Sequence, residues 1–81
     1  MTKDQAMQYV SNALRDIVEE KGETLGEVDE DSILLGSDIP IDSLDLATMV
    51  VQLEILTGHD PFSEGFIEFR TLGELAGLYA N

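Results

Sequence analysis

Ser43 is the residue of this chain with the clearest potential for chemistry, because its hydroxyl stands between carboxylates at the start of a predicted helix. Asp42 precedes it, and Leu44 and Asp45 follow it. Backbone N–H groups at a helix start are unpaired and the helix dipole is positive there, so a phosphate ester on this hydroxyl would be stabilised. Asp-Ser is equally common as simple capping chemistry, in which Asp42 or Ser43 accepts a backbone N–H. These residues alone leave both interpretations open.

The carboxylates beside Ser43 do not suit a site for free phosphate. Asp42 and Asp45 would repel a dissolved anion, and they are better explained as capping groups or as charges that a basic enzyme recognises. The chain has no cysteine and a single histidine, so a thiol nucleophile is excluded and no metal site is expected. We therefore predict that the protein is not an enzyme and that any sulfur chemistry arrives on an attached group.

The helix that must position Ser43 is predicted to begin at Asp42 or Ser43 and to end at Gly58, where a glycine is typical of a helix C-terminus. Leu46, Val50 and Leu53 recur at helical spacing. The first helix in the sequence is predicted over residues 3–21, with a capping box at its start formed by Thr2 and Gln5. A short final helix is predicted after residue 71, where Thr71 and Glu74 form the same capping-box pattern.

The other segments are less regular. Residues 22–42 form a long crossover that contains Gly22, Gly26, Gly36 and Pro40 but also many apolar residues, so we expect it to pack along the bundle, with a short helical turn near residues 32–35. Phenylalanines at positions 62, 66 and 69 have helical spacing and predict one or two helical turns. The expected fold is all-α: an antiparallel four-helix bundle of three main helices and one short helix, in a single domain over residues 1–81.

Composition narrows the range of partners. The 81-residue chain has a formal net charge of −13, from 17 acidic and four basic residues. Nucleic acids and anionic membrane surfaces would be repelled, so neither is expected as a partner, whereas proteins with basic patches are favoured. No apolar run is long enough to cross a bilayer. We expect a cytoplasmic, monomeric protein.

The chain resembles the acyl carrier protein family, whose hallmark is Asp-Ser-Leu at the start of the second helix. Asp42-Ser43-Leu44 matches this tripeptide, and Asp45 continues the match. The further matching segments are Leu34-Leu35-Gly36 with Ile41 upstream, and Asp60-Pro61 with Thr71-Leu72 downstream. The resemblance covers nearly the whole chain in length, helix order and acidic balance, so it is stronger than the tripeptide alone.

This resemblance implies a covalent cofactor and a set of partners. Ser43 would receive 4′-phosphopantetheine from coenzyme A through a separate phosphopantetheinyl transferase, with Asp42 and Leu44 as motif residues. The arm would hold acyl or aminoacyl groups as thioesters. The implied partners are a loading ligase and downstream biosynthetic enzymes with basic docking patches. The protein would hold the intermediate beside each enzyme, because tethering raises its effective concentration there.

The helix over residues 43–57 departs from the usual carrier pattern. Thr48, Ile55 and Leu56 fall about where fatty-acid carriers show acids, and Glu54 is the only acid after Asp45. Either this apolar surface is specialised for partners outside the main fatty-acid synthase, or the long crossover covers it. The residues predicted to bind partners are Asp45, Thr48, Met49, Glu54 and Ile55.

Two further interpretations stay open. The phenylalanines at positions 62, 66 and 69 either cap the core or form a cargo pocket or recognition ridge. The whole chain is either a specialised carrier, for fatty-acid, polyketide, nonribosomal or related biosynthesis, or an acidic helical adaptor that binds a basic protein without a prosthetic group.

Overall fold

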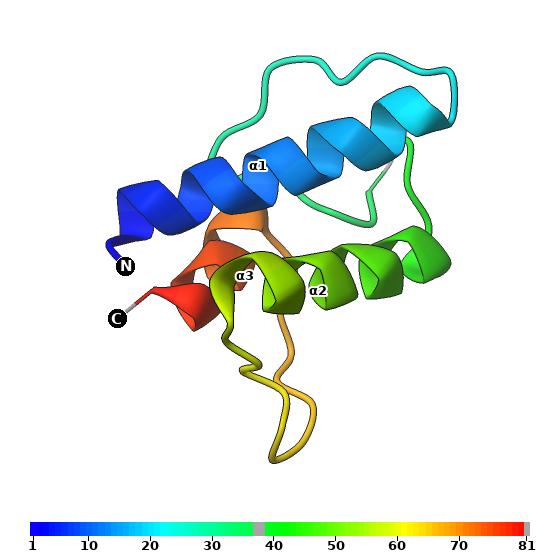
Figure 1. Cartoon of the computed structure of the whole chain (residues 1–81). Helices are drawn as coiled ribbons and strands as arrows, with labels where there is room; N and C mark the ends of the chain where they lie inside the picture. Colours follow the sequence, from blue (N-terminus) through cyan, green and yellow to red (C-terminus); the bar gives the residue numbers. More distant parts are fainter. Residues whose placement is uncertain (37–38, 81) are drawn as a thin grey trace.

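The computed structural model describes residues 1–36 and 39–80, which form three α-helices joined by two long irregular segments (Figure 1). α1 spans Lys3–Glu20, α2 spans Ser43–Thr57 and α3 spans Leu72–Tyr79. The fold is all-α within these described ranges. Residues 37–38 of the predicted crossover, and residue 81 at the end of the predicted domain, lie outside them.

The helices start at the positions that their capping residues predict. Thr2 Oγ1 accepts from the Gln5 N–H at 3.2 Å, while Gln5 Oε1 accepts from the Thr2 N–H at 2.9 Å. Thr71 and Glu74 make the same reciprocal pair at 3.1 Å in each direction. At the end of α2, Gly58 adopts φ +70°, a left-handed conformation that glycine takes without a steric penalty. These local signals confirm the predicted ends of α2 and the start of α3, and α1 ends one residue earlier than expected.

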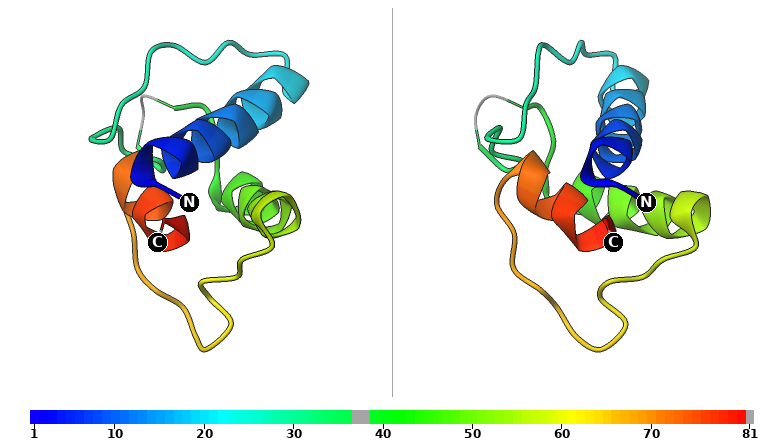
Figure 2. Two further views of the ribbon diagram at one scale, coloured as in Figure 1. Left: turned by 60° about the vertical axis from the view of Figure 1, so that its left-hand side comes forward. Right: turned by 90° about the vertical axis from the view of Figure 1, so that its left-hand side faces the viewer.

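α1 and α2 run antiparallel, and α3 lies beside the N-terminal half of α1 (Figure 1, Figure 2). The side chains that meet between them are apolar because each helix turns its buried face toward the others. The buried apolar side chains of the helices are Ala6, Val10, Ala13, Leu14, Ile17 and Val18 from α1, Met49 and Leu53 from α2, and Leu72, Leu75, Ala76 and Tyr79 from α3. Among the described helices, none is long and apolar enough to cross a membrane.

The crossover between α1 and α2 is held against the start of α3. Leu34 and Ile39 from the crossover lie buried in the core. The Leu34 N–H donates to the Arg70 carbonyl and the Leu72 N–H donates to the Ser32 carbonyl, each at 2.9 Å, which makes an antiparallel bridge around residues 33 and 71. The helical turn expected near residues 32–35 is therefore wrong. This backbone pairs with a distant segment and then turns at Leu34 and Leu35.

The short helix expected from the three phenylalanines is also wrong. Residues 61–64 form turns, and the described residues between α2 and α3 contain no helix. Gly65 adopts φ +138°, which breaks a helical path. The rings of Phe62, Phe66 and Phe69 instead gather into a cluster, with centroids 5.8 to 6.1 Å apart. Phe62 and Phe69 are half-buried against the core, whereas Phe66 is 80% exposed, so only part of this cluster caps the core.

Candidate functional site

The start of α2 is built by a capping box around Ser43. Asp42 is the N-cap: its Oδ1 accepts from the Asp45 N–H at 2.9 Å, and Asp45 Oδ2 accepts from the Asp42 N–H at 3.1 Å. The sequence left open whether Asp42 or Ser43 caps the helix, and the structure assigns the cap to Asp42. Both carboxylates therefore cap the helix start, and the Ser43 side chain is not needed as a cap.

Ser43 is the first residue of α2 and is exposed. Its hydroxyl takes no part in the hydrogen bonds that the described residues form at this helix start. The N–H groups of Ser43 and Leu44 lie in the first turn, where a helix offers them no backbone acceptor. An oxygen presented here is accessible to another protein, and a phosphate attached to it would meet unpaired N–H groups. The geometry therefore fits a phosphate-linked group.

A lysine from α1 joins this site, which the sequence did not lead us to expect. Lys21 Nζ donates to Asp45 Oδ2 at 2.6 Å and to the Pro40 carbonyl at 3.0 Å. The contact connects the C-terminus of α1 to both sides of the Asp42 cap. The available signal was that Lys21 is one of only four basic residues and directly precedes Gly22, where the first helix was predicted to stop.

This contact changes the electrostatics of the pair. The hydrogen bond from Lys21, followed by the one from the Asp42 N–H, holds the pKa of the Asp45 carboxyl below its ordinary value. The same Asp45 contact raises the pKa of Lys21. Asp45 therefore stays ionised into mildly acidic conditions and keeps its bonds to Lys21 and to the cap.

The residues predicted to bind partners divide into three groups. Thr48, Glu54 and Ile55 are exposed on α2 and available to another molecule. Asp45 is half-buried and is engaged by the cap and by Lys21. Met49 is fully buried, so its prediction as a contact residue is wrong. It occupies the core face of α2, four residues before the buried Leu53, where no partner reaches it.

The crossover does not cover the apolar surface of α2. Leu44 is 75% exposed and Ile55 is 76% exposed, while Val51 and Leu56 are also largely open to solvent. The interpretation in which the crossover shields this face is therefore wrong. Apolar side chains extend around α2 well beyond its buried stripe of Met49 and Leu53, which is typical of a helix that meets other proteins.

An apolar cavity of about 320 Å³ opens near the start of α2. Leu46, one helical turn after Ser43, contributes to its wall. The lining residues are Ile33, Leu34, Leu35, Leu46, Phe69 and Arg70. The cavity thus lies between the crossover, the first turn of α2 and the segment before α3.

Comparison with known proteins identifies the family of this fold. No model of a known protein family matches the sequence, and no curated protein matches it at a significant level. A solved structure does match: the solution structure of MacpD, an acyl carrier protein from Pseudomonas fluorescens involved in mupirocin biosynthesis, superposes with a TM-score of 0.84. The two sequences are 34% identical, over 98% of this chain and 71% of MacpD. The chain belongs to the acyl carrier protein family.

Membership of this family confirms the resemblance that the sequence suggested. It also makes a carrier role the general function of this acyl carrier protein. The structure adds which surfaces of the carrier are exposed: the serine at the start of α2, the apolar side of α2, and the Phe66 side of the aromatic cluster.

Proposed function

We propose that this acyl carrier protein holds acyl or aminoacyl intermediates of a specialised biosynthetic pathway on a 4′-phosphopantetheine arm esterified to Ser43. The observation that carries the proposal is the exposed Ser43 at the first position of α2, inside the family's Asp-Ser-Leu motif. The arm supplies a thiol for thioester chemistry, which a chain without cysteine does not have.

The residues around Ser43 have positional roles in this proposal. Asp42 fixes the helix start, and Lys21 and Asp45 hold that start against α1. When the transferase acts, Ser43 Oγ forms the ester bond to phosphorus and its proton passes to a base of the transferase. A pyrophosphate bond of coenzyme A breaks, and adenosine 3′,5′-bisphosphate leaves. This chain supplies the acceptor oxygen and its placement, and the partner enzyme supplies the catalysis.

A specialised pathway is favoured over housekeeping fatty-acid synthesis for two reasons. The matched carrier MacpD is itself involved in mupirocin biosynthesis. The exposed side of α2 carries Thr48, Ile55 and Leu56 rather than a row of acids. We propose as partners a phosphopantetheinyl transferase, a loading ligase and downstream enzymes, all acting on a cytoplasmic monomer. The apolar cavity beside Leu46 is a place for the apolar part of a cargo.

Mass spectrometry tests the attachment site. The protein is incubated with coenzyme A and a broad-specificity phosphopantetheinyl transferase, and the intact mass is measured. The parent is expected to gain one arm, Ser43→Ala none, and Ser63→Ala, which removes another exposed serine, one arm as in the parent. Failure of the parent to gain mass, or a gain by Ser43→Ala, would overturn the proposal and leave an adaptor without a prosthetic group.

A further inference from the structure

An open groove lies between α1 and α2, bordered by residues from the C-terminal half of each helix. We call it the α1–α2 groove, and it has a volume of about 560 Å³. It is lined by Asp16, Glu19 and Glu20 of α1 and by Gln52, Ile55 and Leu56 of α2. Each helix contributes residues spaced by three or four positions, which places them on one side of the helix. The two sides therefore form one continuous surface.

The floor of the α1–α2 groove is apolar and open to solvent. Ile55 is 76% exposed and Leu56 is 57% exposed. Contact with a partner would remove this apolar area from water, which is favourable in proportion to the area buried. The groove is too open to enclose a small molecule on its own. Its shape suits a protruding side chain of another protein.

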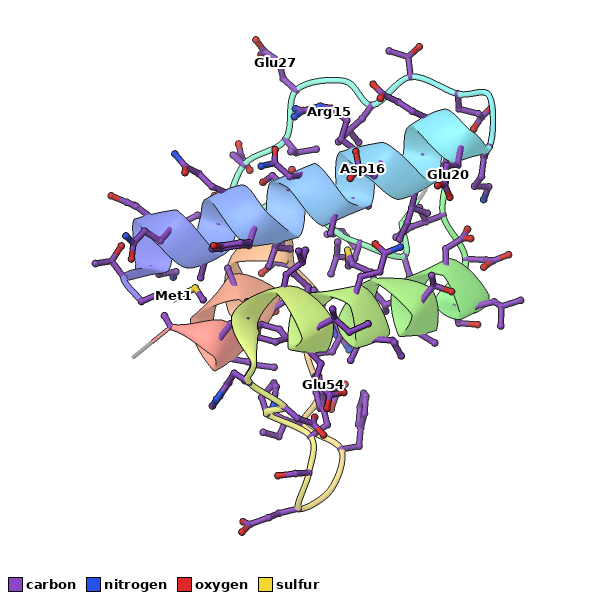
Figure 3. The ribbon with its side chains drawn as sticks, in the orientation of Figure 1. Met1, Arg15, Asp16, Glu20, Glu27 and Glu54 are labelled. Carbon is purple, nitrogen blue, oxygen red and sulfur yellow. The ribbon has the colours of Figure 1, made fainter. Side chains whose placement is uncertain are left out.

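The α1 side of the groove is acidic. Asp16 and Glu20 project from the last turns of α1 (Figure 3). No basic side chain of the residues that the structure describes lines the α1–α2 groove. Lys3 pairs with Glu30 and Lys21 with Asp45, Arg15 lines a cavity under the crossover, and Arg70 lines the cavity beside Leu46. Among the described residues, no salt bridge involves Asp16, Glu19 or Glu20.

We infer that the α1–α2 groove is a docking surface for a protein partner that inserts an apolar side chain flanked by lysine or arginine. Ile55 and Leu56 receive the apolar side chain, and the α1 carboxylates pair with the flanking cations. Identifying this partner as an enzyme that works on the carrier rests on the proposed function. The acidic docking charges thus come from α1 and the apolar contacts from α2.

The test uses a synthetic amphipathic helical peptide with leucines on one face and lysines on both flanks. Binding is followed by amide chemical shifts of the isotope-labelled, full-length protein. Shift changes are expected around residues 16–20 and 52–56, and affinity is expected to fall as salt is raised. Ile55→Ser should weaken binding at least about tenfold, because it removes one large apolar contact. A peptide with glutamates in place of the lysines should not bind.

Matched variants distinguish binding in the α1–α2 groove from non-specific attraction of the peptide to the negative charge of the protein. Phe66→Ser removes an equally exposed apolar residue outside the groove and should leave affinity unchanged. Glu19→Gln with Glu20→Gln should weaken binding, whereas Glu64→Gln with Glu68→Gln, which changes net charge equally, should not. Equal weakening by both pairs, or shift changes centred elsewhere, would overturn the inference.

Two readouts distinguish the remaining outcomes. Arm addition at Ser43 is measured on the same proteins, so a parent that gains the arm but does not bind the peptide contradicts the groove alone. A parent that binds the peptide in the groove without gaining the arm contradicts the proposed function alone. Sedimentation of the protein without peptide shows whether it dimerises, as it would if a second copy of the chain occupied the groove. A dimer that Ile55→Ser dissociates would overturn the inference in favour of self-association.

Discussion

Tyr79 carries an unusual polar atom into the core of this carrier. Its side chain is buried, and its hydroxyl makes no hydrogen bond to any described residue. Burial raises the pKa of Tyr79 to about 12, and the negative charges of Asp60 and Glu54 add to the shift. Its ring packs edge-on against His59, with centroids 6.2 Å apart. The apolar ring therefore contributes to folding, while the hydroxyl opposes it.

Tyr79→Phe should increase the free energy of unfolding by about 1 kcal/mol, because it removes an unpaired buried hydroxyl and keeps the ring. The advantage over the parent should widen above pH 10. The unfolded tyrosine ionises near 10 and the folded one near 12, so the parent loses stability through that interval. Urea unfolding at neutral and alkaline pH measures both effects. A destabilised Phe variant would indicate that the hydroxyl has a partner.

At the residue scale, the motif around Ser43 was predictable because it is a local pattern. Asp42, Ser43 and Asp45 lie within one helical turn, and their roles in a helix start follow from spacing alone. The burial of Met49 was not predictable in the same way. Nine of the 15 residues of α2 are apolar and they occur on all of its sides, so the sequence does not show which face of that helix is buried.

The close approach of α3 to the crossover depends on a glycine. The Gly73 N–H donates to the Glu30 carbonyl at 2.9 Å. A Cβ on Gly73 would lie 2.9 Å from that carbonyl oxygen and 2.8 Å from the Glu30 Cβ. Contacts this short with backbone atoms cannot be relieved by a change of side-chain rotamer. The first turn of α3 and the crossover would have to separate.

Gly73→Ala should therefore lower the free energy of unfolding by about 2 kcal/mol, in the range typical of overpacked sites. Gly77→Ala is the matched control in the same helix. Nothing lies within 4 Å of its added Cβ, so the higher helix propensity of alanine should raise stability by about 1 kcal/mol. Chemical denaturation of both variants measures the contrast. If both substitutions change the free energy of unfolding in the same direction, the close approach at Gly73 is not a tight contact.

The side chain of Lys21 makes a polar link between the end of α1 and the start of α2, and it has two acceptors, Asp45 Oδ2 and the Pro40 carbonyl. Lys21→Met should raise the pKa of Asp45 toward its ordinary value, because the largest contribution to its lowered pKa is the Lys21 hydrogen bond. Carboxyl chemical shifts followed against pH measure this change. Stability from Asp45 is present above its ordinary pKa and is lost as pH falls through the lowered one, so the variant should lose stability at a higher pH.

The matched control for this prediction is Lys3→Met, which breaks the exposed pair with Glu30. It changes the net charge equally but should leave the pKa of Asp45 unaltered. Faster amide exchange is expected at the start of α2 in Lys21→Met alone. An unchanged Asp45 titration in Lys21→Met would refute the link.

At the element scale, sequence patterns predicted the helices better than the segments between them. Thr2, Thr71 and Gly58 are local signals, and the structure places helix ends at each. The crossover takes its shape from pairing with residues 70–73, some forty positions away, which no local pattern reports. The phenylalanine spacing was misleading because a ring cluster satisfies it without a helix.

The whole molecule has an excess of negative charge that few internal contacts relieve. Its formal net charge is −13, and the ion pairs formed within the described residues are those of Lys3 and Lys21. Repulsion among so many carboxylates opposes the compact state. The fold therefore depends on its apolar core more than on its surface electrostatics.

Added salt should raise the melting temperature by several degrees between low ionic strength and about 0.15 M NaCl, because screening weakens this repulsion. Thermal unfolding followed by circular dichroism measures the change. Glu64→Gln with Glu68→Gln carries two fewer negative charges and should melt higher at low salt, with a smaller rise. A melting temperature that stays constant or falls with salt contradicts this account.

The bridge between the crossover and the start of α3 has a consequence for how the carrier is made. The crossover residues 30–34 obtain their partners only after the ribosome has released residues 70–73. An eight-residue helix such as α3 is too short to persist alone. Until those residues have emerged, the crossover that leads into α2 lacks this support, so the helix start at Ser43 would be held in its final place only afterwards.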